Sequence, residues 1–350
     1  MKRFTTSFTL VIAALSSTAF GQVKETAAFL SLASGGNPQG YVQGANAQGI
    51  IFATAQGGQG QLLAYSKIKG EGLDKLIRFE DRVEALGEPR ALFASGDYAE
   101  AATAFGDVAR NYAIILSVPQ SFAAEAVFYQ MESLKRAGNY AALAQLVGAP
   151  VSKVVETNLG ERYQKLHEFQ KLWAKLGAKD MEGLKTAIAT YENPVVGDAK
   201  LLSTPNFKKR PPNELAQLAY LRAKVYDAGG DSAKALEDYY RAFTLAAGND
   251  DLVAKLAMGA AMVSHKKDPK FSPDDARLVS QLQGLAYLYS KRFGKDTMPK
   301  EFQEFAVRPP MVKMAPAEEA APEAAPAEGE APTPVKADTP PADAKAKGKK

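Results

Sequence analysis

Hydrophobic side chains recur three and four positions apart through most of the chain, from about Leu73 to Phe305. This spacing places apolar residues on one face of an α-helix. Glycine, proline and asparagine interrupt the pattern at intervals, as they do between helices. The sequence therefore predicts a mainly α-helical body over residues 73–305.

A different pattern comes before this body. Short apolar runs alternate with turns rich in glycine, asparagine and glutamine, a pattern typical of a tight β-meander. We expect a small β-module of about three strands over residues 40–72, with residues 22–39 as a linker before it. The runs are Tyr41-Val42, Ile50 to Thr54 and Leu62 to Tyr65.

The first 21 residues have the features of a secretory signal peptide. Lys2 and Arg3 come before an apolar stretch from Phe8 to Leu15, and Ala19 and Gly21 supply the small residues that a signal peptidase reads. The stretch is shorter than the roughly 20 residues that a membrane helix needs, although a retained anchor helix is the alternative. We expect a periplasmic or secreted protein without a membrane span after removal of the signal peptide 1–21.

The composition changes again near the C-terminus, where alanine, proline, glutamate and lysine predominate. Such a segment buries too little apolar surface to offset the entropy lost on ordering. The sequence predicts a disordered tail over residues 306–350. Its lysine-rich end, Lys345 to Lys350, is a candidate for contact with anionic material of the cell envelope.

One short pattern repeats within the helical body: a helix end, a glycine, a polar residue and a new helix. Glycine permits the left-handed backbone that ends one helix, and Asp or Asn beside it can cap the next. The copies are Gly96-Asp97, Gly138-Asn139, Gly230-Asp231 and, more weakly, Gly177 to Asp180.

The copy around Gly230 resembles the tetratricopeptide repeat (TPR) family. The matching positions are Ala223, Tyr226, Gly230, Ala235, Tyr239 and Ala242. The resemblance covers roughly residues 85–260, and the glycine separations depart from the family period of about 34 residues. It implies stacked helix pairs that form an α-α superhelix with a concave face.

The resemblance also implies which side chains face a partner. The family's ligand-facing positions fall in two segments of this sequence and would form a groove of mixed charge. A solvated helix face is the alternative for each residue. The positions are Gln217, Tyr220, Lys224 and Asp227 in one segment, and Glu125, Phe128, Glu132, Lys135 and Arg136 in the other.

Few residues point to catalysis. The chain has no cysteine, and its two histidines, His167 and His265, match no metal-binding spacing. We expect His167 at the surface or boundary of a helix. Sequence motifs of nucleophilic, phosphate-binding and dinucleotide-binding sites are absent from the sequence. We therefore expect no enzyme activity, no cofactor and no metal.

The net charge of +4, of which Lys2 and Arg3 supply two, is too small and too scattered for a nucleic-acid-binding protein. The sequence favours an exported TPR-like scaffold or adaptor that binds one or more protein partners in the bacterial cell envelope. Two alternatives stay open: a self-assembling structural envelope protein, and an envelope hydrolase with an unrecognised carboxylate site.

Overall fold

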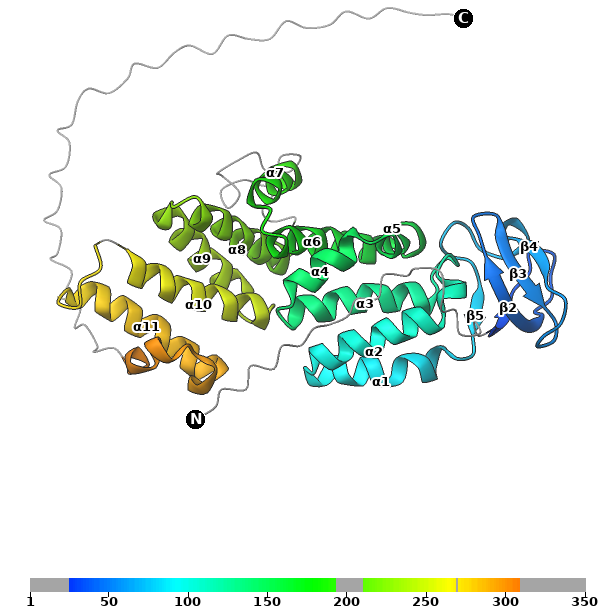
Figure 1. Ribbon diagram of the computed structural model, residues 1–350, viewed down its shortest axis with the longest axis horizontal. Coiled ribbons are helices and arrows are strands. Elements are labelled where there is room, and N and C mark those ends of the chain that lie inside the picture. The colour runs from blue at the N-terminus through cyan, green and yellow to red at the C-terminus, as the bar shows by residue number, and fades with distance from the viewer. Residues whose placement is uncertain (1–24, 193–209, 269, 309–350) are drawn as a thin grey trace, which may run out of the picture. The chain divides into compact units, whose positions relative to one another are not determined.

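The protein consists of a small N-terminal antiparallel sheet followed by helices (Figure 1). The computed structural model describes residues 25–192, 210–268 and 270–308. The predicted class, mainly α with a small N-terminal sheet, is confirmed. The expected signal peptide and nearly all of the expected tail lie outside the described residues, so both stay predictions.

The sheet has five strands in the order β4-β3-β2-β1-β5, all antiparallel to their neighbours. It is larger than the predicted three-stranded module, because β1 lies within the expected linker and β5 within the expected helical region. The strands are β1 (Thr26–Leu30), β2 (Gln39–Ala45), β3 (Gly49–Ala53), β4 (Gln61–Ala64) and β5 (Ile77–Phe79).

One face of the sheet is buried against the first helices. Ala28, Leu30 and Val42 are buried on this face, as expected for alternate residues of paired strands. The ring of Phe79 meets the ring of Phe122 edge-on at 5.7 Å. The sheet and the helical body therefore share one hydrophobic core.

The helical body begins at Arg82 and not at residue 73, because β5 and its turn take up the residues before it. In the described residues, no helix is sufficiently long and apolar to span a membrane. The body ends in a 3-10 segment, Lys300–Phe305. The α-helices are α1 (Arg82–Ser95), α2 (Tyr98–Asn111), α3 (Phe122–Arg136), α4 (Tyr140–Gly148), α5 (Lys153–Asn158), α6 (Glu161–Gly177), α7 (Met181–Glu192), α8 (Pro212–Ala228), α9 (Ser232–Ala246), α10 (Asp251–Lys267) and α11 (Ala276–Phe293).

The turns predicted at three glycines are confirmed. Gly96, Gly138 and Gly230 have φ angles of 92°, 73° and 80°, and they separate α1 from α2, α3 from α4 and α8 from α9. Asn139 and Asp231 accept hydrogen bonds from the backbone N–H groups of the helices that they begin. Asp97, beside Gly96, makes no such cap and instead accepts a hydrogen bond from Ser95 Oγ at 2.6 Å. The glycine turn, with a polar cap at two of its three copies, thus recurs in a helical-repeat-like fold.

The fourth turn, between α6 and α7, differs from the predicted form. Gly177 is the last residue of α6, and Lys179 takes the left-handed conformation with a φ of 58°. Asp180 accepts a hydrogen bond from the N–H of Gly183. The polar cap is present, but a lysine replaces glycine at the strained position.

Candidate functional site

The nine residues expected to line a partner groove lie on α3 and α8. Five of them are buried, with exposed fractions of 3–6%, so their side chains do not face solvent as a groove wall would. Their small apolar neighbours allow the adjacent helices to approach closely and cover them. The five are Glu125, Phe128, Lys135, Gln217 and Tyr220.

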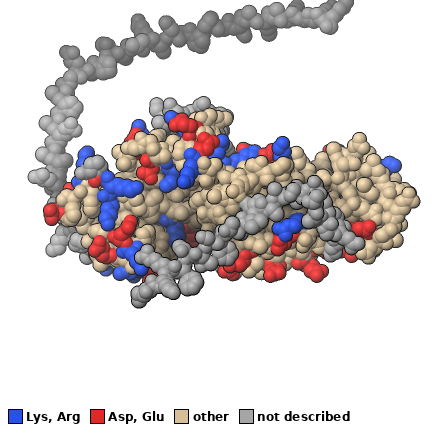
Figure 2. Space-filling model, in the orientation of Figure 1, with Lys and Arg blue, Asp and Glu red and all other residues tan. Residues whose placement is uncertain are grey.

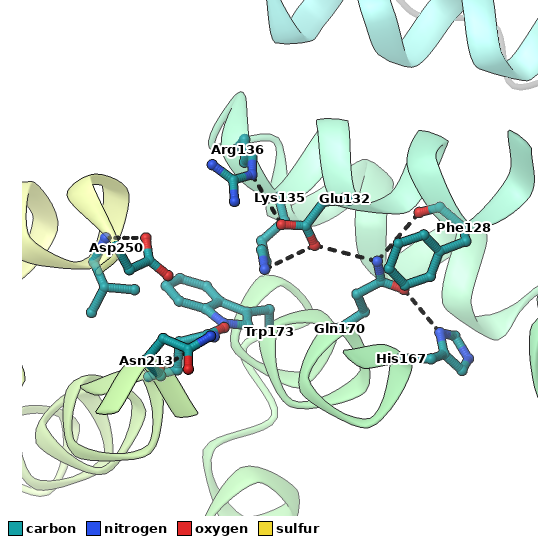
Figure 3. Close-up of polar contacts among 11 residues, drawn as sticks. Phe128, Glu132, Lys135, Arg136, His167, Gln170, Trp173, Asn213 and Asp250 are labelled. Atoms are coloured by element: carbon teal, nitrogen blue, oxygen red, sulfur yellow. Dashed lines mark hydrogen bonds and ion pairs between the residues drawn. The ribbon is translucent and has the colours of Figure 1, made fainter. Parts of the chain in front are cut away.

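Glu132 of α3 is the centre of a buried polar network between α3 and α6 (Figure 3). Its carboxylate accepts hydrogen bonds from Lys135 Nζ at 2.9 Å and Arg136 Nε at 3.0 Å. Gln170 of α6 donates to the same carboxylate at 3.4 Å and to the backbone carbonyl of Phe128 at 3.3 Å. Burial opposes ionisation of Glu132, but the two cations outweigh it and hold its pKa below the usual range.

Glu125 forms a second buried contact, between α3 and α1. Its two oxygens bind Arg82 Nη2 at 2.9 Å and Arg90 Nη2 at 2.7 Å. The hydroxyl of Tyr163 on α6 lies 3.4 Å away. Because both arginines are half exposed and the carboxylate is buried, Glu125 anchors α1 to α3 from inside the protein.

Trp173 of α6 and Gln217 of α8 form a third buried contact. The indole Nε1 donates to the Oε1 atom of Gln217 at 2.9 Å. We call Glu125, Glu132, Gln170 and Gln217 the polar seam, because each pairs a polar group of one helix with a group of a helix from another part of the chain. The seam crosses the contacts among α1, α3, α6 and α8.

Aromatic rings lie beside the polar seam. Trp173 stacks on Tyr140 at a centroid distance of 5.2 Å and on Tyr220 at 5.3 Å, and Tyr220 lies 5.9 Å from Tyr239. Burial raises the pKa of Tyr140 to about 12. Tyr220, expected to contact a partner, instead packs between α6 and α9.

Apart from Glu132, the remaining predicted groove residues are partly exposed: Lys224, Asp227 and Arg136. Lys224 Nζ lies 4.0 Å from Asp227 Oδ2, and the hydroxyl of Tyr239 donates to the same Asp227 oxygen at 3.3 Å. Arg136 lies over the ring of Phe93 at 5.5 Å from its centroid. Lys224, Asp227 and Arg136 are 31%, 32% and 33% exposed, so these three are the predicted groove residues that remain accessible from outside.

Both histidines are buried, which corrects the expectation that His167 lies at a surface or boundary. His167 Nδ1 lies 3.0 Å from Gln170 Oε1, and His265 Nε2 lies 2.6 Å from the Tyr240 hydroxyl. Burial lowers the pKa of each histidine. Within residues 25–192, 210–268 and 270–308, no cluster of three or more His, Cys, Asp or Glu could hold a metal ion.

Two open hollows lie away from the predicted positions. One, of about 460 Å³, lies between α1 and α2 and is edged by Glu84, Glu88, Glu100 and Asp107 around Leu92 and Val108. This hollow was not predicted from the sequence, although Glu84 and Glu88, two acidic residues four positions apart, are a visible signal. The other, of about 430 Å³, is lined by Phe243, Ala247, Met258 and Leu288 with Lys291 and Arg292 beside them.

No protein-family model matches the chain, and a search of curated proteins found no similar sequence.

Proposed function

We propose that the protein is an exported TPR-like scaffold or adaptor that mediates protein-protein interaction in the bacterial cell envelope. The observation that carries the proposal is the recurring helix pair with a left-handed glycine and a polar residue at its turn. Gly138 with Asn139 and Gly230 with Asp231 have this geometry, and TPR-like stacks use it repeatedly.

The polar seam supports a rigid stack. Burying charged groups is unfavourable unless they are paired, and a fully paired network allows few alternative arrangements of the helices. Glu125 and Glu132 each contact two cations. The seam would hold successive helix pairs at fixed angles and so present their outer surfaces to a partner in one arrangement.

The same contacts favour a scaffold over an envelope hydrolase. A hydrolytic carboxylate site needs acids that differ in pKa beside a substrate pocket. The carboxylates of Glu125, Glu132 and Asp238 each lie against arginine or lysine, and none of the three borders either hollow. In this proposal, these carboxylates stabilise the packing of the helices.

The two hollows are the surfaces on which we place partner contacts. The hollow between α1 and α2 combines four carboxylates with an apolar floor, which suits a basic amphipathic segment. Arg82 and Arg90 of α1 are engaged by Glu125, and Arg110 pairs with Asp107, so Glu84, Glu88 and Glu100 are the remaining carboxylates of this hollow. Lys224 provides a third, smaller contact.

Affinity capture from envelope extract with the purified chain tests this function. We expect a protein partner that is lost after the double change Glu84→Lys and Glu88→Lys, which reverses the charge of the α1–α2 hollow. Glu182→Lys on α7, whose side chain is 88% exposed, is the matched control and should retain the partner. Lys224→Ala measures the contribution of α8 separately.

If the wild-type chain captures no envelope protein, the proposed scaffold function is wrong. If the Glu84→Lys, Glu88→Lys chain retains the partner, the partner contacts a different surface of the protein. Export belongs to the same proposal and is tested by cell fractionation with N-terminal sequencing, which should find Gln22 as the first residue. Release of the fractionated protein by salt would support contact between the lysine-rich tail and anionic envelope material.

A further inference from the structure

Strand β4 is an edge of the sheet. Among the described residues it pairs only with β3, from Gln61 opposite Phe52 to Ala64 opposite Gly49. An edge strand leaves every second N–H and C=O of its backbone without a partner in the sheet. The free groups of β4 can be identified from the ladder.

The backbone N–H groups of Leu62 and Ala64 point away from β3. The N–H of Tyr65 donates to the carbonyl of Gln48 at 3.1 Å, which makes this a hydrogen-bonded pair. Antiparallel pairs alternate along a ladder, so Leu62 and Ala64 occupy non-hydrogen-bonded positions. The close approach at Gly49 agrees, because a Cβ atom there would lie 2.8 Å from the Ala64 Cα.

Apolar side chains accompany this free edge. Leu62 lies directly opposite Ile51, so both project from the same face of the sheet. They are 53% and 38% exposed, among the most exposed large apolar residues that the structure describes. Another strand added beside β4 would cover Leu62.

The edge also lacks the usual protection against pairing. Natural edge strands carry charged residues, proline or a bulge that discourages another strand. The sequence contains no Asp, Glu, Lys or Arg from Thr26 to Ser66, and β4 contains no proline. Figure 2 shows a mostly uncharged surface over the sheet, in contrast to the charged helices. The bulge of this sheet lies between Val42 and Gly44 in β2, away from β4.

We propose that β4 pairs antiparallel with β4 of a second copy of this chain and joins two sheets into one. Two identical antiparallel strands can be related by a two-fold axis, so one edge satisfies both copies. Neither β3 nor β4 contains a charged residue, so no like charges of these strands face each other across the new ladder. Leu62 and Ile51 of both copies would form one apolar cluster. This inference is independent of the partner surfaces on the helices.

A strand of four residues buries little surface compared with a standard interface of roughly 1,600 Å². The association should therefore depend on protein concentration. Sedimentation velocity of the full chain over a hundredfold range of concentration should show a monomer that converts to a dimer. Cross-linking is unnecessary, since the mass ratio identifies the species.

Two variants test the edge by different routes. Ala64→Pro removes one outward N–H at a residue whose φ of −63° already suits proline, so the fold should tolerate it. Leu62→Lys places a positive charge on β4 of each copy, so the two charges would repel each other in the dimer. Both should weaken dimerisation at least tenfold, while Leu288→Lys on α11, where Leu288 is 54% exposed, should leave it unchanged.

Circular dichroism and the thermal midpoint establish that each variant is folded. A wild-type chain that stays monomeric over the whole range overturns the proposal, even if it captures strands of other proteins. A dimer that survives Ala64→Pro and Leu62→Lys in folded protein overturns it as well, because the interface would then lie elsewhere. Loss of the dimer in Leu288→Lys alone would assign it to α11.

Discussion

The indole Nε1 of Trp173 donates a hydrogen bond of 2.9 Å to Gln217 Oε1, and both side chains are buried. The bond joins α6 to α8, two helices separated in the chain by α7. Gln217, which the TPR resemblance assigned to partner binding, therefore contacts another helix of the same protein. Stability measurements can test the packing at this bond, at Gly230, at Glu125 and at the two histidines.

Gln217→Leu should lower the free energy of unfolding by about 1–3 kcal/mol, because it leaves the buried indole N–H without an acceptor. Trp173→Phe leaves Gln217 Oε1 without its donor, although Gln217 Nε2 keeps its hydrogen bond to the Asn213 carbonyl, and it also alters the ring contacts. The double variant should lose less than the sum of the two single losses, since neither unpaired group then remains. Urea denaturation measures all three. Gln56→Leu, at an exposed loop residue, is the control and should change stability by less than about 0.5 kcal/mol.

Gly230→Ala should destabilise the chain by about 1–2 kcal/mol through the backbone alone. Its φ is 80°, and an added Cβ would have no atom within 4 Å, so left-handed strain is the sole expected effect. Gly259→Ala in α10 also meets no atom but has no positive φ. It should stabilise the chain by about 0.5–1 kcal/mol. Equal effects of the two changes in thermal unfolding would contradict this assignment.

Glu125→Gln should cost about 1–2 kcal/mol, because it removes the charge that Arg82 and Arg90 share while keeping the shape of the side chain. Asp107→Asn removes a charge from a pair with Arg110 whose side chains are 51% and 68% exposed. That change should cost at most about 0.5 kcal/mol, since water screens exposed pairs. A loss at Glu125 no larger than at Asp107 would mean that the buried carboxylate does not anchor α1.

Stability should fall as the pH drops below about 6.5. Burial lowers the pKa of His167 and of His265 below the value of 6.5 that an unfolded chain has. The unfolded chain then binds these protons at a higher pH than the folded chain does. The stabilising contribution is complete above pH 6.5 and is lost toward the folded-state pKa values. Each histidine contributes a slope of at most about 1.4 kcal/mol per pH unit.

Urea midpoints at several pH values measure this slope. His167→Gln keeps a hydrogen-bonding side chain but removes the titrating group, so it should flatten the profile between the two pKa values. An unchanged profile in both His167→Gln and His265→Gln would assign the acid sensitivity to other groups. Glu132, whose pKa is lowered, contributes only at more acidic pH, where its protonation removes the attraction of Lys135 and Arg136.

Local patterns predicted much of the fold. The helix pairs around Gly138 and Gly230 were predictable because turn and cap chemistry are local properties of a few residues. Strand β5 was not predictable, since Ile77–Phe79 is too short for a periodic signal and pairs with β1 far along the chain. Lys179 took the left-handed position expected of a glycine, because the bonds that close this turn, from the N–H groups of Lys179 and Asp180 to the carbonyls of Leu176 and Lys175, are backbone bonds that any residue can make.

The candidate site was less predictable than the fold. The TPR resemblance placed Tyr220 and Lys224 on one helix face, and α8 does carry both. Whether a helix face meets solvent or another helix depends on the angle between helix pairs, which repeat spacing does not specify. Burial of Tyr220 against Trp173 is therefore a result of packing and not of the motif.

The sequence by itself determined the helical class, the small N-terminal sheet and the position of three glycine turns, because backbone propensity and side-chain periodicity act over a few residues. The tertiary structure alone decided that Glu125, Glu132, Gln170 and Gln217 pair inside the protein, and that β4 is left at an open edge. Each of these outcomes depends on which segments meet, and contacts between distant segments form only when the chain is folded.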